Sequence, residues 1–108
     1  MVEEINRYDI VLVTLNPTIG SEIQKTRPCI VISPYEMNSL KTVIVAPMTS
    51  QGFDFIFRPK IKFEGKNGLV LLDQIRAVDK TRIVKKMGIV EKNKAKEIAK
   101  MLLEIFEY

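Results

Sequence analysis

The chain has 108 residues, 46% hydrophobic and 28% charged, with a net charge of +4, which predicts one globular domain and mildly favours an acidic partner. A single cysteine excludes an internal disulfide, and the absence of histidine excludes a histidine base, a His–Cys zinc site and a Ser–His–Asp triad. No apolar run approaches the roughly 20 residues of a membrane span, and no apolar signal segment opens the sequence, so we expect a cytoplasmic protein.

Alternating and β-branched residues predict strands through most of the chain. The first, Asp9–Leu15, has apolar residues on both sides of its alternation and should be buried on both faces. Turn residues follow it at Asn16–Glu22, and Glu64–Gly68 has the composition of a hairpin turn. Later strands are predicted at 28–33, 42–47, 55–63 and 69–75, with a last one inside 82–90.

The C-terminal segment changes to helical periodicity. Its apolar residues recur every three or four positions, from Ala95 through Ile98 and Leu102 to Phe106. This predicts an amphipathic helix of about 16 residues that lies on the sheet, with a weak N-cap because no Ser, Thr or Asp precedes it. No linker or repeat interrupts the chain, so residues 1–108 are predicted to be a single domain: a mostly β, antiparallel barrel or sandwich with one C-terminal helix.

Polar segments follow the first, third and fifth predicted strands. They are Gly20–Arg27, Met48–Gln51 and Asp73–Arg76. If the strands form an up-and-down antiparallel meander, these three exits share one end of the barrel. We therefore expect hydroxyl, amide, carboxylate and guanidinium groups to converge at one rim.

Three stretches, 9–34, 43–50 and 69–88, resemble in this order the MazF/PemK family of toxin endoribonucleases from toxin–antitoxin modules. The resemblance runs from Ile5 to the end of the chain. It implies an SH3-like barrel closed by a C-terminal helix, a homodimer, and cleavage of single-stranded RNA without a metal ion or other cofactor. Attack by the 2′-OH would give a 2′,3′-cyclic phosphate and a 5′-OH. The implied protein partner is a cognate antitoxin whose acidic tail blocks the site.

The family pattern also implies roles for individual residues by position. Its catalytic arginine falls on Arg27 and its catalytic threonine on Thr49, and the glutamate of its Gly-Ser-Glu loop is Glu22. Arg27 would bind the phosphate oxygens, and Glu22 is the first candidate for the general base, with Asp73 second. Residues expected to contact the RNA are Ser21, Ser50, Gln51, Phe53, Asp73, Gln74 and Arg76, with Phe53, Phe55 and Arg76 as candidate planes for base stacking.

The sequence departs from the family pattern at three positions. Tyr8 stands where a glycine commonly precedes the aspartate of the first strand, which alters a turn. Ser21 and Leu71 stand where the PemK branch has its catalytic histidine and arginine. The PemK catalytic set is therefore not expected here, apart from the aspartate that matches Asp73.

Each candidate residue also has a purely structural interpretation. Arg27 can be a solvated loop charge, and Thr49 can be a hydroxyl that caps a local turn. Phenylalanines at 53, 55 and 57 are typical of the core face of a strand. The corresponding interpretations are a solvated pair for Lys85 and Lys86 and a small buried residue for Cys29.

Two other functions fit the same fold class. A gyrase poison of the CcdB type would depend on residues 106–108 rather than on Arg27, and a non-catalytic RNA-binding barrel would bind RNA without forming a product. Arg27 together with Thr49 favours the ribonuclease. The unbroken apolar run Leu69–Leu72 agrees with the implied dimer.

Overall fold

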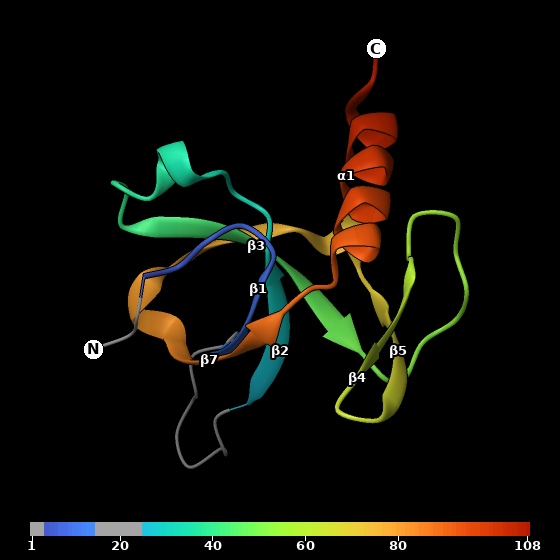
Figure 1. Ribbon diagram of the computed structural model, residues 1–108, viewed down its shortest axis with the longest axis horizontal. Coiled ribbons are helices and arrows are strands. Elements are labelled where there is room, and N and C mark those ends of the chain that lie inside the picture. Colours follow the sequence, from blue (N-terminus) through green and yellow to red (C-terminus); the bar gives the residue numbers. More distant parts are fainter. Residues whose placement is uncertain (1–3, 15–24) are drawn as a thin grey trace.

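The computed structural model describes residues 4–14 and 25–108, in which a seven-stranded antiparallel sheet curls into a half-barrel beside one α-helix (Figure 1). The strands are β1 (Asp9–Thr14), β2 (Thr26–Val31), β3 (Thr42–Thr49), β4 (Lys60–Phe63), β5 (Lys66–Val70), β6 (Arg76–Asp79) and β7 (Ile83–Ile89). The helix α1 spans Lys92–Phe106, and the short 3₁₀ helices are η1 (Tyr35–Met37), η2 (Leu72–Gln74) and η3 (Lys80–Arg82). None of the helices in these ranges is long and apolar enough to cross a membrane.

Strand β3 organises the sheet because three other strands pair with it. The order is β4-β5-β3-β2-β1-β7, and β6 also pairs with β3. The first half of β3 pairs with β6, whereas its last two residues, Met48 and Thr49, pair with β5. Leu69 on β5 is the neighbour of both Thr49 on β3 and Lys60 on β4. One residue of β5 therefore lies between the two ends of the segment 50–59.

Strand β1 contributes to two hydrophobic clusters. Its residues Val11 and Val13 belong to one cluster, whereas Ile10 belongs to the other, which contains Ala95 and Ile98 of α1. All three β1 side chains are 4% exposed or less. The prediction that this strand is buried on both faces is thus confirmed, and so is the fold class of a mostly β barrel with a C-terminal helix.

The strand order is not the simple meander that the sequence predicted. Strand β5 lies between β3 and β4, and it is antiparallel to β3. Neighbouring antiparallel strands leave the sheet at opposite ends, so the segment after β5 leaves in the direction opposite to the segment after β3. The predicted strand at 55–63 is reduced to β4, which begins after Pro59, and the predicted strand at 69–75 ends at Val70, before η2.

Two local features set the ends of elements. Glu64 and Gly65 have φ values of 51° and 78° and connect β4 to β5; two successive positive φ values are typical of a type I′ hairpin turn, so the predicted hairpin is confirmed. The prediction of a weak N-cap for α1 was wrong, because Glu91 caps the helix. Its carboxylate accepts hydrogen bonds from the backbone N–H groups of Asn93 (3.2 Å) and Lys94 (3.4 Å).

Candidate active site

Arg27 and Thr49 meet where β2 and β3 end. The two strands pair antiparallel as far as Cys29 opposite Pro47, and beyond this pair Arg27 and Thr49 line one open pocket. Ser50 and Gln51, which follow β3, line the same pocket. Arg27, at the end of the first predicted polar segment, thus shares a pocket with residues of the second.

The hydroxyl of Thr49 is oriented by the backbone of Gln51. Its Oγ1 donates to the carbonyl oxygen of Gln51 at 2.7 Å and accepts from the N–H of Gln51 at 3.1 Å. This is the local turn cap that the sequence allowed as the structural interpretation of Thr49. Both bonds are exposed to solvent, so an incoming acceptor can compete with the Gln51 carbonyl for the hydroxyl proton.

The backbone at Thr49 is held by the close approach of β5. A Cβ atom added to Gly68 would lie 2.6 Å from the carbonyl oxygen of Thr49, a separation that real Cβ atoms do not show. Only glycine therefore lets β5 run at this distance from the end of β3. Gly68 also lines the pocket that contains Arg27 and Thr49.

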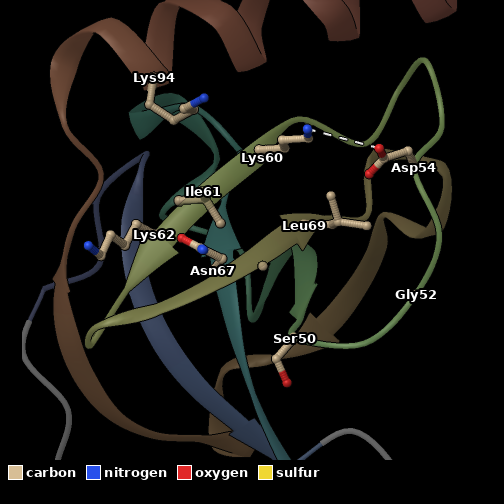
Figure 2. A pocket seen from close by; sticks show the side chains of 10 residues that line it. Ser50, Gly52, Asp54, Lys60, Ile61, Lys62, Asn67, Leu69 and Lys94 are labelled. Atoms are coloured by element: carbon tan, nitrogen blue, oxygen red, sulfur yellow. Dashed lines mark ion pairs between the residues drawn. The ribbon is translucent and has the colours of Figure 1, made fainter.

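The β4–β5 hairpin places both signs of charge on the wall of this pocket and further lysines beyond it. Glu64 and Lys66 line the pocket of Arg27, and Lys60 and Lys62 line a neighbouring pocket with Lys94 of α1. Figure 2 shows the three lysines around this second pocket, with Lys60 directed toward Asp54 at 3.9 Å. Since Ser50 lines both pockets, a basic surface continues from Arg27 across the hairpin to α1.

The third predicted polar segment, Asp73–Arg76, is connected to the segment after β3 by Arg58. Arg58 was not among the predicted site residues. Arg58 donates from Nε to Asp73 Oδ1 at 3.0 Å and from Nη2 to Asp73 Oδ2 at 2.9 Å. The bidentate hydrogen bond from Arg58 holds the pKa of the Asp73 carboxyl below its usual range. A lowered pKa makes Asp73 a weaker base than a free aspartate. The available signal for Arg58 was its place directly after three alternate phenylalanines.

The charges of Arg27 and Arg76 both act on the pKa of the Cys29 thiol. Burial raises the pKa of the Cys29 thiol to about 12, and the charges of Arg27 and Arg76 oppose this rise. Arg76 begins β6 opposite Val45 of β3, and its side chain is exposed. The thiol itself is fully buried, so the prediction of a small buried residue at Cys29 is confirmed.

The predicted site residues are therefore only partly brought together. Arg27, Thr49, Ser50 and Gln51 share the pocket, whereas Phe53, Asp73, Gln74 and Arg76 are not among its lining residues. Ser21 and Glu22 lie outside the described residues. In the ranges 4–14 and 25–108, no group of three or more His, Cys, Asp or Glu side chains is arranged to hold a metal ion.

The interpretation of the alternate phenylalanines as the core face of a strand was wrong for Phe53 and Phe55. Phe53 and Phe55 lie in the segment between β3 and β4, and their exposed fractions are 69% and 50%. They are therefore neither strand residues nor core residues. The exposed rings instead pack against Arg58, whose guanidinium carbon lies 4.9 Å from the centre of the Phe53 ring.

Comparison with known proteins gives consistent matches along the chain. Residues 6–106 match the family described as PemK-like, MazF-like toxin of type II toxin–antitoxin system. The endoribonuclease toxin ChpB of Escherichia coli K12 is 34% identical over 112 aligned positions, covering 96% of each chain. The endoribonuclease MazF of Staphylococcus saprophyticus is 33% identical over 102 positions, covering 87% of this chain and 84% of the relative.

Solved structures agree on the fold. A chain of the MazE–MazF crystal structure (Form-II) from Deinococcus radiodurans superposes with a TM-score of 0.80 at 22% identity. The superposition covers 95% of this chain and 96% of the other. At that identity the likeness concerns the fold, and it extends over nearly the whole of both chains.

Proposed function

The chain belongs to the PemK-like, MazF-like toxin family of type II toxin–antitoxin systems, and from this membership we propose that it is a sequence-selective, metal-independent endoribonuclease acting on single-stranded RNA. The observation that carries the proposal is that Arg27 and Thr49 line one pocket, in a chain 34% identical to an endoribonuclease toxin. Residues 1–108 would form a single toxin domain that acts on messenger RNA in the cytoplasm.

The proposed reaction uses the nucleophile that RNA itself carries. The 2′-OH loses its proton and attacks the adjacent phosphorus, the bond from phosphorus to the 5′-oxygen breaks, and the leaving 5′-oxygen takes a proton from water. The products are a 2′,3′-cyclic phosphate and a 5′-OH. Negative charge grows on the two non-bridging oxygens during the attack. Arg27 is exposed at the rim, and its planar guanidinium can donate to both of these oxygens.

Thr49 supplies a second donor in this proposal. Its hydroxyl, which donates to the carbonyl of Gln51 at 2.7 Å, would instead donate its hydrogen bond to a non-bridging phosphate oxygen when RNA binds. The bond from the Gln51 N–H would remain and keep the oxygen in place. Because this donor acts where charge develops, its loss should cost about 10²- to 10³-fold in rate.

The proton of the 2′-OH needs a base, and we assign this role to Glu22 on the basis of the family loop. Asp73 is the weaker candidate because Arg58 lowers its pKa and occupies both of its carboxylate oxygens. Ser21 would be a further donor beside Glu22. The remaining proposed RNA contacts are Ser50, Gln51, Phe53, Gln74 and Arg76.

The decisive experiment compares a single-stranded RNA with its all-deoxy copy in the presence of EDTA. Cleavage of the RNA alone, with a 2′,3′-cyclic phosphate at the new end, is the expected result. Cleavage of both strands, or a requirement for magnesium, would reject attack by the 2′-OH. Arg27→Ala should abolish cleavage with little change in thermal stability because its side chain is exposed, whereas the matched exposed arginine variant Arg7→Ala should cleave normally.

The proposed partners are a cognate antitoxin with an acidic tail and a second copy of the chain. An acidic segment lying across the pocket would meet Arg27, Lys66 and the lysines of the hairpin, which supports a charge-driven block of the site. An acidic peptide should therefore compete with RNA, and its inhibition should weaken as salt is raised. Sedimentation of the purified chain tests the homodimer.

The gyrase-poison alternative makes the opposite prediction. Deleting residues 106–108 would abolish growth inhibition while Arg27→Ala would retain it. A non-catalytic RNA-binding barrel would bind the RNA and leave it intact. A gyrase poison has no use for Arg27 with Thr49, and the relatives named as endoribonucleases favour a catalytic barrel over one that only binds RNA.

A further inference from the structure

An aromatic surface with an arginine packed against it lies on the segment between β3 and β4. The guanidinium carbon of Arg58 is 4.9 Å from the centre of the Phe53 ring and 5.9 Å from that of Phe55. The Arg58 side chain is only 12% exposed, whereas Phe53 is 69% exposed. The charge is thus covered, and much of the Phe53 ring is open to solvent.

Arg58 is held in place by η2. Its two hydrogen bonds to Asp73, at 3.0 Å and 2.9 Å, fix the plane of the guanidinium as well as its position. A bidentate pair leaves the group little freedom to turn toward a phosphate. Arg58 is therefore suited to support the aromatic rings, and Asp73 is suited to orient Arg58.

This assembly lies next to the candidate catalytic threonine. A Cβ atom built on Gly52 would have the Thr49 γ-methyl at 3.6 Å and Nη1 of Arg58 at 3.9 Å. Thr49 and Arg58 therefore both lie within 4 Å of the position that a side chain at residue 52 would take, and the φ of 137° there favours glycine. The next residue in the chain is Phe53. A nucleotide joined to a phosphate at Thr49 would be close to the Phe53 ring.

We propose that Phe53, supported by Arg58 and oriented through Asp73, is a stacking subsite for one unpaired base of the RNA substrate, beside the phosphate that is cleaved. This inference rests on the proposed ribonuclease function. An exposed aromatic ring is a sequence-tolerant surface for a base. Lys60, which is 79% exposed and lies 3.9 Å from Asp54, is a cation near this segment that can contact the strand that carries the base.

Fluorescence of 2-aminopurine tests the subsite directly. The cleavage position is first mapped with the wild-type protein, and a non-cleavable copy of that RNA carries a 2′-deoxy group at the attacking nucleotide. A 2-aminopurine placed at each flanking position in turn should be quenched on binding at one position. The quenching should be lost in Phe53→Ala and Phe53→Leu and retained in Phe53→Tyr, and the affinity of Phe53→Ala should fall about 5- to 100-fold.

Abasic RNA separates stacking from any general effect of the substitution. With intact RNA, kcat/KM of Phe53→Ala should fall; with an abasic site at the quenched position, wild type and Phe53→Ala should cleave equally. Tyr35→Ala is the matched control, since Tyr35 is an aromatic residue of 65% exposure in η1, across the molecule from the 50–59 segment in Figure 1. It should behave as wild type with both RNAs.

The positioning of Phe53 by Arg58 and Asp73 is tested by the quenching and by comparing kcat/KM on intact and abasic RNA. Arg58→Ala and Asp73→Asn should each weaken the quenching and lower kcat/KM with intact RNA, with smaller losses on the abasic RNA. Asp73→Glu, which keeps a carboxylate for Arg58, should restore more of the quenching than Asp73→Asn. A structural defect would instead lower the activity on both RNAs equally.

Three results would overturn the inference while the ribonuclease stands: no quenching at any position, equal quenching with Phe53→Ala, or equal sensitivity of both proteins to every abasic site. If Phe53→Ala weakens only the binding of an acidic antitoxin peptide, the ring is a protein-docking surface and the inference is also wrong. If the wild-type protein cleaves no RNA at all, the proposed function itself fails.

Discussion

Lys86 lies 3.2 Å from Asp9, a carboxylate whose side chain is only 3% exposed. The same oxygen of Asp9 accepts a hydrogen bond of 2.8 Å from the backbone N–H of Asn6. The sequence had predicted a solvated pair for Lys85 and Lys86, and for Lys86 that prediction was wrong. Its ammonium group joins β7 to the buried start of β1.

Replacing Lys86 should therefore destabilise the fold. Lys86→Ala would leave the buried Asp9 carboxylate without its cation, and we expect the free energy of unfolding to fall by about 2 to 3 kcal/mol. Urea denaturation measures this change. Lys85→Ala is the matched control, because Lys85 is exposed on the same strand and should change the free energy by less than about 0.5 kcal/mol. Equal effects of the two substitutions would mean that the ion pair contributes nothing.

Gly68→Ala should damage the site through the backbone. The new methyl group would collide with the carbonyl oxygen of Thr49, so β5 and the end of β3 must move apart, at a cost of about 1 to 3 kcal/mol. RNA cleavage should fall more than stability alone explains, since Thr49 moves with its carbonyl. Gly65→Ala provides the comparison: it strains a positive φ of 78° but meets no atom within 4 Å, and it should cleave RNA normally once folded.

Substitutions at Thr49 should separate the contribution of its hydroxyl to the cleavage rate from that of its side-chain volume. Thr49→Val keeps the volume but removes both hydrogen bonds to Gln51, and its kcat should fall about 10²- to 10³-fold if the hydroxyl donates to the phosphate. Thr49→Ser keeps the hydroxyl and should stay much closer to wild type. Single-turnover cleavage with saturating protein measures both. Equal rates for the valine and serine variants would assign Thr49 a purely structural role.

Cys29 should be inert in the folded protein. Burial raises the pKa of its thiol from 9.0 to about 12, so a thiol reagent at pH 8 should react only after unfolding. The raised pKa also has a stability consequence: the contribution of the neutral thiol is complete below pH 9 and is lost as the pH rises from 9 toward 12. Between pH 8 and 10 the wild type should lose about 1 kcal/mol more than Cys29→Ala. Parallel losses in the two proteins would contradict the raised pKa.

The elements that could be predicted from the sequence are those that a local pattern of residues determines. The alternation of Asp9–Leu15 predicted a strand buried on both faces, and the spacing from Ala95 to Phe106 predicted α1. Both of these predictions depend on residues close together in the chain. The turn at Tyr8 came instead from the family resemblance, in which a glycine is common at this position, and the φ of 72° at Tyr8 agrees with it.

The rest depended on pairing between distant segments. Nothing in the residues around Leu69 states that β5 pairs with β3 rather than with β4 alone. Asp73 contacts the segment that follows β3 through its hydrogen bonds to Arg58. Alternate phenylalanines at 53 and 55 have the period of a strand, yet the cation of Arg58 holds both rings at the surface. Arg58 follows the three phenylalanines directly, but its partner Asp73 is 15 residues further along the chain, and no local pattern connects the two.

The position of Leu69 between Thr49 and Lys60 has a consequence for how recognition can diversify. Because β5 fixes both ends of the 50–59 segment, residues 53–57 in its middle can change without disturbing the strand that carries Arg27 or the Gln51 backbone that orients Thr49. Transplanting these five residues between relatives should alter which RNA sequence is cut and leave the intrinsic speed of the chemistry in place. Substrate choice and catalytic rate would then evolve independently, and a small toxin could acquire a new target by exchanging five residues.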